Sequence, residues 1–231
     1  DLGRETRARE VTFICVFHHG LTGTGDRRFD SWPLIVVSSE KQFMSLTLQE
    51  LRSQIREEIA AITSFDSIEK AVIADALDWV DSGVELFRVE KPATPPKHLV
   101  SYFLLIDGDD FLLVDHIKSG LWLPSGGHVE PGEHPRTTVE REIIEELGIS
   151  AEFVFPEPQF ITATTTVGQT AGHIDVSLWY LVRGHRSQRL DFDHDEFTQV
   201  QWFSRHDAPY ERVEPELGRF LAKLEGLVRK A

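Results

Sequence analysis

The 231-residue chain has few of the features that mark several broad protein classes. Cys15 is its one cysteine, so an intrachain disulfide is excluded and nothing points to an oxidising compartment. Its apolar runs, such as 11–17 and 34–37, are much shorter than the ~20 residues that cross a bilayer, and no signal-peptide layout surrounds them. These absences predict a cytoplasmic protein with no membrane partner.

Positive charge is also scarce. The chain has 24 Lys and Arg residues against 38 Asp and Glu residues, which gives a formal net charge of −14. This balance argues against a nucleic-acid polymer as a partner, because the phosphate backbone binds basic surfaces. An acidic protein that binds phosphorylated small molecules must supply cations locally, and a bound metal ion is one way to do so.

Methionine is as rare as cysteine, and Met44 is the one example. We predict that residues 1–43 form an N-terminal extension, which is non-native if Met44 is the natural start. The alternative is a genuine β-hairpin with strands at 11–17 and 34–37. The sequence leaves both interpretations open.

Residues 44–97 have helical character followed by a proline-rich linker. Thr47 suits a helix N-cap, and apolar residues then recur at three- and four-residue intervals. The two stripes are Leu48, Leu51, Ile55, Ile59 and Ile62, and then Ile68, Val72, Ala76, Trp79 and Val80. They predict a small helical hairpin that packs on the core, closes a substrate pocket or forms a homodimer interface.

Residues 98–231 are predicted to form the main domain. The runs 100–106 and 111–114 read as a hairpin, and further strands are expected at 122–123, 152–155, 160–166, 173–182 and 200–203. The run 173–182 alternates Ile174, Val176, Leu178 and Tyr180 with more polar residues, which predicts a strand with one apolar face. An amphipathic helix over 215–228 closes the chain.

Between these strands, residues 127–149 read as a glycine loop that leads into an acidic helix. Pro135 suits the first helical turn and Gly148 suits the residue after the last, so we expect a helix over 134–147. At 100° per residue, one arc of this helix carries Val139, Ile143, Ile144 and Leu147, and the neighbouring arc carries Glu142, Glu145 and Glu146. Carboxylates at this spacing repel one another, and a divalent cation such as Mg²⁺ would offset the repulsion.

The same stretch resembles the Nudix box of the MutT-like hydrolases. That box reads Gly, five residues, Glu, seven residues, Arg-Glu, an aliphatic, any residue, Glu-Glu, any residue, Gly and an aliphatic. Every fixed position matches, at Gly127, Glu133, Arg141, Glu142, Ile143, Glu145, Glu146, Gly148 and Ile149. Seven fixed identities at a usage of roughly 7% each would coincide on the order of once in a hundred million starts.

The resemblance implies an α/β (α+β) fold, the Nudix αβα sandwich with a mixed β-sheet. It implies divalent-metal-dependent hydrolysis of a diphosphate linkage in a nucleoside diphosphate derivative. Glu142, Glu145 and Glu146 would bind Mg²⁺ or Mn²⁺, with the backbone carbonyl of Gly127 as a further ligand. Arg141, which the helical spacing sets away from the acidic arc, would pair with Glu133 to hold the loop.

Other assignments stay open at this stage. The general base is Glu145 or a residue of the acidic loop 191–196, and His173, Asp175, Trp122 and Glu196 are candidate substrate contacts. The family's markers for ADP-ribose and for dinucleoside polyphosphates are absent from 164–168, so the substrate is not specified. The alternative function is a catalytically silent Nudix-like module that senses or binds a nucleotide.

Overall fold

The computed structural model describes residues 47–91, 94–166 and 172–228, all within the unit Met44–Ala231. The predicted extension over 1–43, with its alternative hairpin, lies outside these residues. The division at residue 97 into a hairpin and a main domain stays a prediction. In the described part of the chain, no helix is long and apolar enough to cross a membrane.

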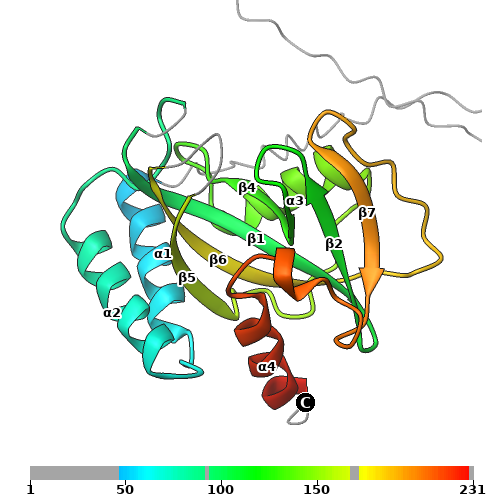
Figure 1. Ribbon diagram of the computed structural model, residues 1–231. Helices are drawn as coiled ribbons and strands as arrows, with labels where there is room; N and C mark the ends of the chain where they lie inside the picture. The colour runs from blue at the N-terminus through cyan, green and yellow to red at the C-terminus, as the bar shows by residue number, and fades with distance from the viewer. Residues whose placement is uncertain (1–46, 92–93, 167–171, 229–231) are drawn as a thin grey trace, which may run out of the picture. The chain divides into compact units, whose positions relative to one another are not determined.

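Two helices precede the sheet, as the periodicity predicted (Figure 1). They are α1 (Leu48–Ala61) and α2 (Ser67–Asp81). Thr47 caps α1 in a capping box, since it accepts a hydrogen bond from the Glu50 amide and the Glu50 carboxylate accepts one from the Thr47 amide. The first residue of each predicted apolar stripe is not part of the core, since Leu48 and Ile68 are exposed. Later members of the stripes are buried: Leu51, Ile55, Ala76 and Val80.

A seven-stranded mixed sheet forms the centre of the fold. Its strands are β1 (Lys97–Asp107), β2 (Asp110–His116), β3 (Leu121–Leu123), β4 (Ser125–His128), β5 (Phe160–Thr165), β6 (Ile174–Arg183) and β7 (Phe197–Phe203). The hydrogen-bonded order is β3-β2-β1-β6-β5, with β4 paired to β1 and β7 to β2. Only the β1–β6 pair is parallel among the described strands, and it aligns Leu99 with Val176.

Helices cover both faces of this sheet. One face packs against α1, α2 and α3 (Pro135–Leu147), around a core that includes Phe103, Leu178 and Tyr180. The other face packs against α4 (Leu217–Val228), which follows a short 3-10 helix, η2 (Tyr210–Arg212), around a core that includes Trp179 and Phe220. The predicted αβα sandwich with a mixed sheet is therefore confirmed.

Two details of the strand prediction were wrong. Glu152–Phe155 forms no strand, because a single bridge between Phe153 and Val182 is its one ladder contact. Strand β6 has no exposed polar face, since Ser177, Trp179 and Leu181 are as buried as the alternate residues. Tryptophan and serine were counted as polar positions, but Trp179 packs in the core with Phe220 of α4, and Ser177 is buried within the sheet between β1 and β5.

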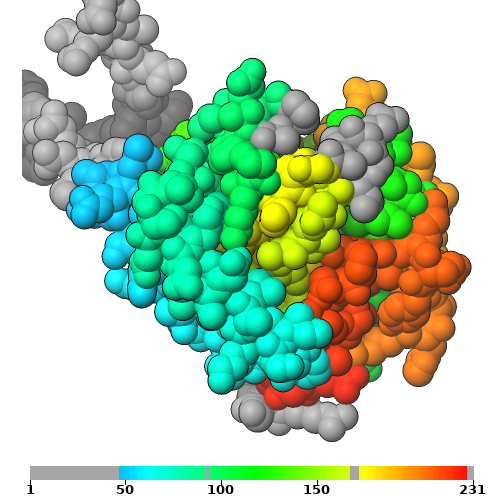
Figure 2. All heavy atoms as spheres, turned by 60° about the vertical axis from the view of Figure 1, so that its left-hand side comes forward, coloured from blue at the N-terminus to red at the C-terminus, as the bar shows by residue number. Residues whose placement is uncertain are grey.

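The helical hairpin packs against the edge of the sheet and the C-terminal helix. In Figure 2, residues of α2 lie beside the segment of β5 and the start of α4. The Lys223 ammonium lies 2.7 Å from a Glu69 carboxylate oxygen, and Arg219 contacts both oxygens of Asp66. These ion pairs join α2 to α4, so the hairpin is part of the same packed unit as the sheet.

Candidate active site

The helix α3 begins and ends where the sequence predicted. His134 is the N-cap and accepts a hydrogen bond from the Arg136 amide, Pro135 is the first helical residue, and Gly148 ends the helix in the left-handed region at φ 68°. Val139, Ile143 and Leu147 are fully buried against the sheet. This packing fixes the rotation of α3 and so fixes where its carboxylates lie.

Arg141 and Glu133 form the ion pair that the sequence suggested. Arg141 Nε lies 3.0 Å from Glu133 Oε1, and Arg141 Nη2 lies 3.0 Å from Glu133 Oε2. Burial opposes ionisation of Glu133, but hydrogen bonds from Arg141, the Glu130 amide and Thr138 outweigh it and lower the pKa of Glu133. The pair joins the loop after β4 to the middle of α3.

The prediction that Arg141 lies away from the acidic arc was wrong. Its third nitrogen lies 2.7 Å from a Glu142 oxygen and 3.3 Å from a Glu145 oxygen. Glu145 is one turn later on the same side of the helix, and the long arginine side chain also reaches Glu142, the next residue in the sequence. Arg141 is therefore held among three carboxylates, which raises the pKa of its guanidinium.

Two carboxylates of the helix are withdrawn from solvent. Glu146 is 5% exposed and accepts a hydrogen bond of 3.1 Å from the Gly126 amide. Burial raises the pKa of Glu142 and raises the pKa of Glu146 well above its usual value, with further contributions from neighbouring carboxylates that include Glu196. Burial thus disfavours the ionised form of both groups, although Arg141 partly offsets this at Glu142.

The glycines of β4 allow these carboxylates to approach the strand. A Cβ at position 127 would lie 1.9 Å from a Glu142 oxygen, and a Cβ at position 126 would lie 2.1 Å from the Ser101 carbonyl oxygen. Backbone atoms exclude a side chain at position 126, and a side chain at position 127 would displace the Glu142 carboxylate. The glycine loop of the sequence motif is therefore required for close packing of α3 on β4.

A cavity of about 420 Å³ opens beside β4. Six of the predicted site residues line it: Gly127, Glu142, Glu146, His173, Asp175 and Glu196. Glu133, Arg141 and Glu145 do not line it; the Glu145 side chain is 59% exposed beside Arg141. The structure thus brings the acidic loop before β7 to the same cavity as the carboxylates of α3.

Trp122 was expected to contact substrate, and the structure contradicts this. Its ring is 6% exposed and packs edge-on against Phe203, with the Arg212 guanidinium on the ring. Strand β3 is short, and Trp122 points into the core between the sheet and α4, whereas its neighbours Leu121 and Leu123 line the cavity.

Several cavity residues were not predicted. They include Arg88, Lys91, Tyr102, Lys118, His128 and Glu214. Arg88 and Lys118 bring positive charge to an otherwise acidic wall, whereas burial lowers the pKa of His128 to about 3 and keeps its ring neutral. Their sequence positions share no spacing, so only the fold could bring them together.

The residues that line the cavity fit a hard divalent cation. Mg²⁺ and Mn²⁺ take oxygen ligands and are held by a few carboxylates together with substrate phosphates. Glu142 and Glu146 supply carboxylate oxygens inside the cavity, where burial raises the pKa of both and a bound cation would favour their ionised forms. Glu145 lies at the edge of this group.

Glu214, just before α4, gives a pH-dependent prediction. It is 4% exposed, and burial raises its pKa from 4.5 to about 8. Between these values the folded chain binds one proton more than the unfolded chain, so stability falls as pH rises from 4.5 to 8. We expect Glu214→Gln to remove this loss and to be more stable than the parent at pH 8, by on the order of a few kcal/mol, but not at pH 4.5.

Urea unfolding in EDTA at both pH values measures the difference. Glu211→Gln, at an exposed position three residues earlier, is the matched control and should follow the parent at each pH. Parallel stability curves for Glu214→Gln and the parent would show that Glu214 ionises normally.

A family model and several solved structures are similar to this chain. The NUDIX domain model matches residues 96–224, which is more than half of the chain. Among solved structures, a NUDIX-family hydrolase from Clostridium perfringens is 21% identical over 56% of this chain and 97% of its own, with a TM-score of 0.46. A MutT NUDIX hydrolase from Burkholderia pseudomallei is 22% identical over 55% and 97%, with a TM-score of 0.45.

A third similar structure is the binary complex of a C. elegans Ap4A hydrolase, 20% identical over 58% of this chain and 98% of its own, with a TM-score of 0.45. The match to the domain model spans the sheet, α3 and most of α4. The chain belongs to the NUDIX family and is a hydrolase of that family.

Proposed function

We propose that the chain hydrolyses a diphosphate linkage in a nucleoside diphosphate derivative, with Mg²⁺ or Mn²⁺ as the cofactor. The metal would be held by Glu142, Glu145 and Glu146, with the Gly127 carbonyl as a further ligand. The observation that carries the proposal is the pair of largely buried carboxylates, Glu142 and Glu146, on the wall of one cavity.

A divalent cation in this place neutralises phosphate oxygens and lowers the pKa of bound water. Four side chains of this chain would assist that chemistry. Arg141 and Glu133 fix the rotation of the carboxylates, and Arg88 and Lys118 supply positive charge that a diphosphate requires. These groups position an anionic substrate against the acidic helix.

For the general base, the cavity favours the acidic loop over the helix. Glu196 lines the cavity and lies near enough to raise the pKa of Glu142 and Glu146, whereas Glu145 is largely exposed and touches Arg141. We therefore infer that Glu196 is a better placed base than Glu145. Contacts of His173 and Asp175 with substrate remain part of the proposal. The cytoplasmic location and a homodimer stay predictions.

The test is product release from a panel of nucleoside triphosphates, oxidised deoxynucleotides, ADP-ribose, nucleotide sugars and dinucleoside polyphosphates. Turnover with Mg²⁺ that disappears in EDTA is expected, and the best substrate names the class. If the panel is not hydrolysed but a nucleotide raises the melting temperature, the chain is the catalytically silent binding module instead.

A further inference from the structure

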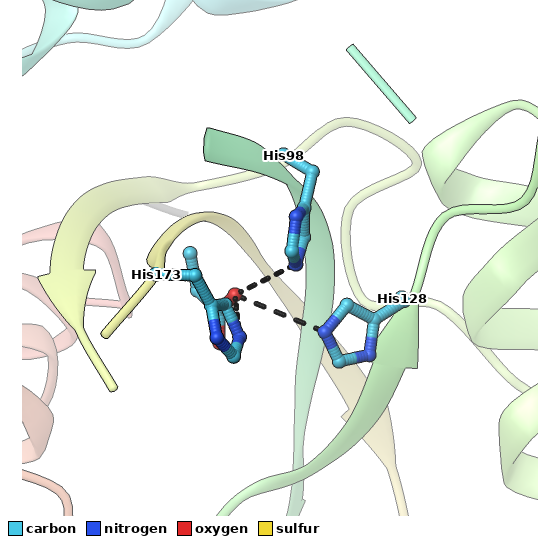
Figure 3. Close-up of side chains that lie close together, drawn as sticks. His98, His128 and His173 are labelled. Carbon is cyan, nitrogen blue, oxygen red and sulfur yellow. Dashed lines mark ion pairs between the residues drawn. The ribbon is translucent and has the colours of Figure 1, made fainter. Parts of the chain in front are cut away.

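Three histidines and one aspartate meet at one end of the cavity. His98 comes from β1, His128 from β4, His173 from the residue before β6 and Asp175 from β6, and the three rings point toward one another (Figure 3). One Asp175 oxygen, Oδ1, lies 3.2 Å from His98 Nε2, 3.3 Å from His173 Nε2 and 3.8 Å from His128 Nε2. One ligand atom from each residue lies within 4.8 Å of the others.

The hydrogen bond of His98 defines its tautomer. Its Nδ1 lies 2.7 Å from the Pro95 carbonyl oxygen, which can only accept, so Nδ1 must carry the proton. In the neutral ring, Nε2 then carries no proton and presents a lone pair. That lone pair is fully buried and faces a carboxylate oxygen, and neither His98 Nε2 nor Asp175 Oδ1 has a hydrogen-bond partner in the described part of the chain.

The other two rings are oriented in the same way. Arg88 is a donor only, and one of its nitrogens lies 3.0 Å from His128 Nε2, so this nitrogen also presents a lone pair. The Thr166 hydroxyl donates to the His173 carbonyl oxygen and can accept from His173 Nδ1, which lies 3.1 Å away. In the tautomer with the proton on Nδ1, the Nε2 lone pair of His173 is directed at Asp175.

Three imidazole nitrogens and a carboxylate oxygen therefore converge, and Arg88 is the donor that contacts one of them, His128 Nε2. Such an arrangement of acceptors is repulsive when empty, and a cation at its centre makes it attractive. We propose that His98, His128, His173 and Asp175 form a second metal site, for a divalent transition ion such as Zn²⁺, separate from the carboxylate site on α3.

The donor types and distances select this class of ion. Imidazole nitrogen suits Zn²⁺ and its transition-metal neighbours, whereas Mg²⁺ requires oxygen. In a tetrahedral site with bonds of about 2.1 Å, neighbouring ligand atoms lie about 3.4 Å apart. The three distances to Asp175 Oδ1 fall close to that value. Hydrogen bonds from Nδ1 to an outer acceptor also orient His98 and His173, as metal-binding histidines require.

Arg88 competes with the metal ion for His128 Nε2. Its guanidinium occupies the His128 lone pair, and it is partly exposed, so it can move toward solvent when metal enters. Arg88→Gln removes a competing positive charge and should therefore tighten metal binding. If the cluster is instead an ordinary ion pair, with one histidine protonated against Asp175, Arg88→Gln should not increase the affinity for metal.

The test is titration of the metal-depleted full chain with Co²⁺ and Zn²⁺ in excess Mg²⁺. One ion per chain is expected, with the visible absorption bands of imidazole-bound Co²⁺ and an increase in melting temperature. His98→Gln, His128→Gln and Asp175→Asn should each weaken binding by at least ~100-fold. His128 is the most exposed of the three histidines, so His128→Gln carries the test if a variant at a buried position does not fold.

Two controls separate this site from others. Glu146→Gln should leave the Co²⁺ bands unchanged, although it should weaken the Mg²⁺-dependent reaction, so the two proposals fail independently. His206→Asn, at an exposed position, and joint replacement of His18 and His19 should also bind as the parent does. Loss of the Co²⁺ bands in Mg²⁺ or in Glu146→Gln, or their persistence in His128→Gln and Asp175→Asn, would overturn the proposal.

Discussion

Glu146→Gln is expected to lower kcat/KM by at least ~100-fold, because charge stabilisation by a metal ion contributes several kcal/mol to the transition state. Glutamine has the same shape, and its carbonyl oxygen can still accept the hydrogen bond from the Gly126 amide. It cannot supply the negative charge that a divalent ion requires. The loss should therefore appear as weaker metal activation and lower turnover in a protein that is correctly folded.

Stability should change in the opposite direction. Burial, together with the charge of Glu142, raises the pKa of Glu146, so the ionised side chain costs stability at neutral pH when no metal is present. Glu146→Gln should thus unfold at a higher urea concentration than the parent in EDTA. The parent should regain stability in Mg²⁺ and the variant should regain less.

Glu140→Gln is the matched control on the same helix. Glu140 is exposed and pairs with Arg136 one turn earlier, so this variant should retain both the activity and the stability of the parent. Full Mg²⁺-dependent activity in Glu146→Gln, once the substrate is known, would remove Glu146 from the metal site.

The sequence predicted the parts of the site that lie within one continuous stretch. The spacing of Glu133, Arg141 and the helix carboxylates depends on local geometry, which helical periodicity and the terminal Pro135 and Gly148 define. Their contacts could therefore be expected before the fold was known, apart from the reach of the Arg141 side chain. The burial of Glu146 could not, since it depends on the Gly126 amide of another strand.

The rest of the cavity depends on how strands distant in sequence are paired. The parallel register of β1 and β6 sets His98 beside Asp175, and β4 adds His128 across the antiparallel pair with β1. No spacing in the sequence encodes that register. A helix on each face of the sheet also buries both sides of β6, which reverses the assignment that alternation had suggested.

The largest expected effect on folding is at the ion pair between the hairpin and α4. Lys223→Met should lower the free energy of unfolding by about 3–5 kcal/mol, because removal of one partner leaves a buried charge uncompensated. Glu69 is fully buried, and besides Lys223 it accepts hydrogen bonds from the Phe65 and Ile161 amides. Methionine retains the apolar stem beside Phe160 and removes only the charge.

A double-mutant cycle distinguishes the loss of the pair from general damage to the core. Adding Glu69→Gln to Lys223→Met removes the orphaned charge and keeps an acceptor for both amides, so most of the lost stability should return. Lys70→Met, at an exposed position of α2, should change stability by no more than ~0.5 kcal/mol. If urea unfolding shows the double variant to be as unstable as the sum of the single variants, the two side chains are not coupled and this ion pair does not stabilise the contact between the hairpin and α4.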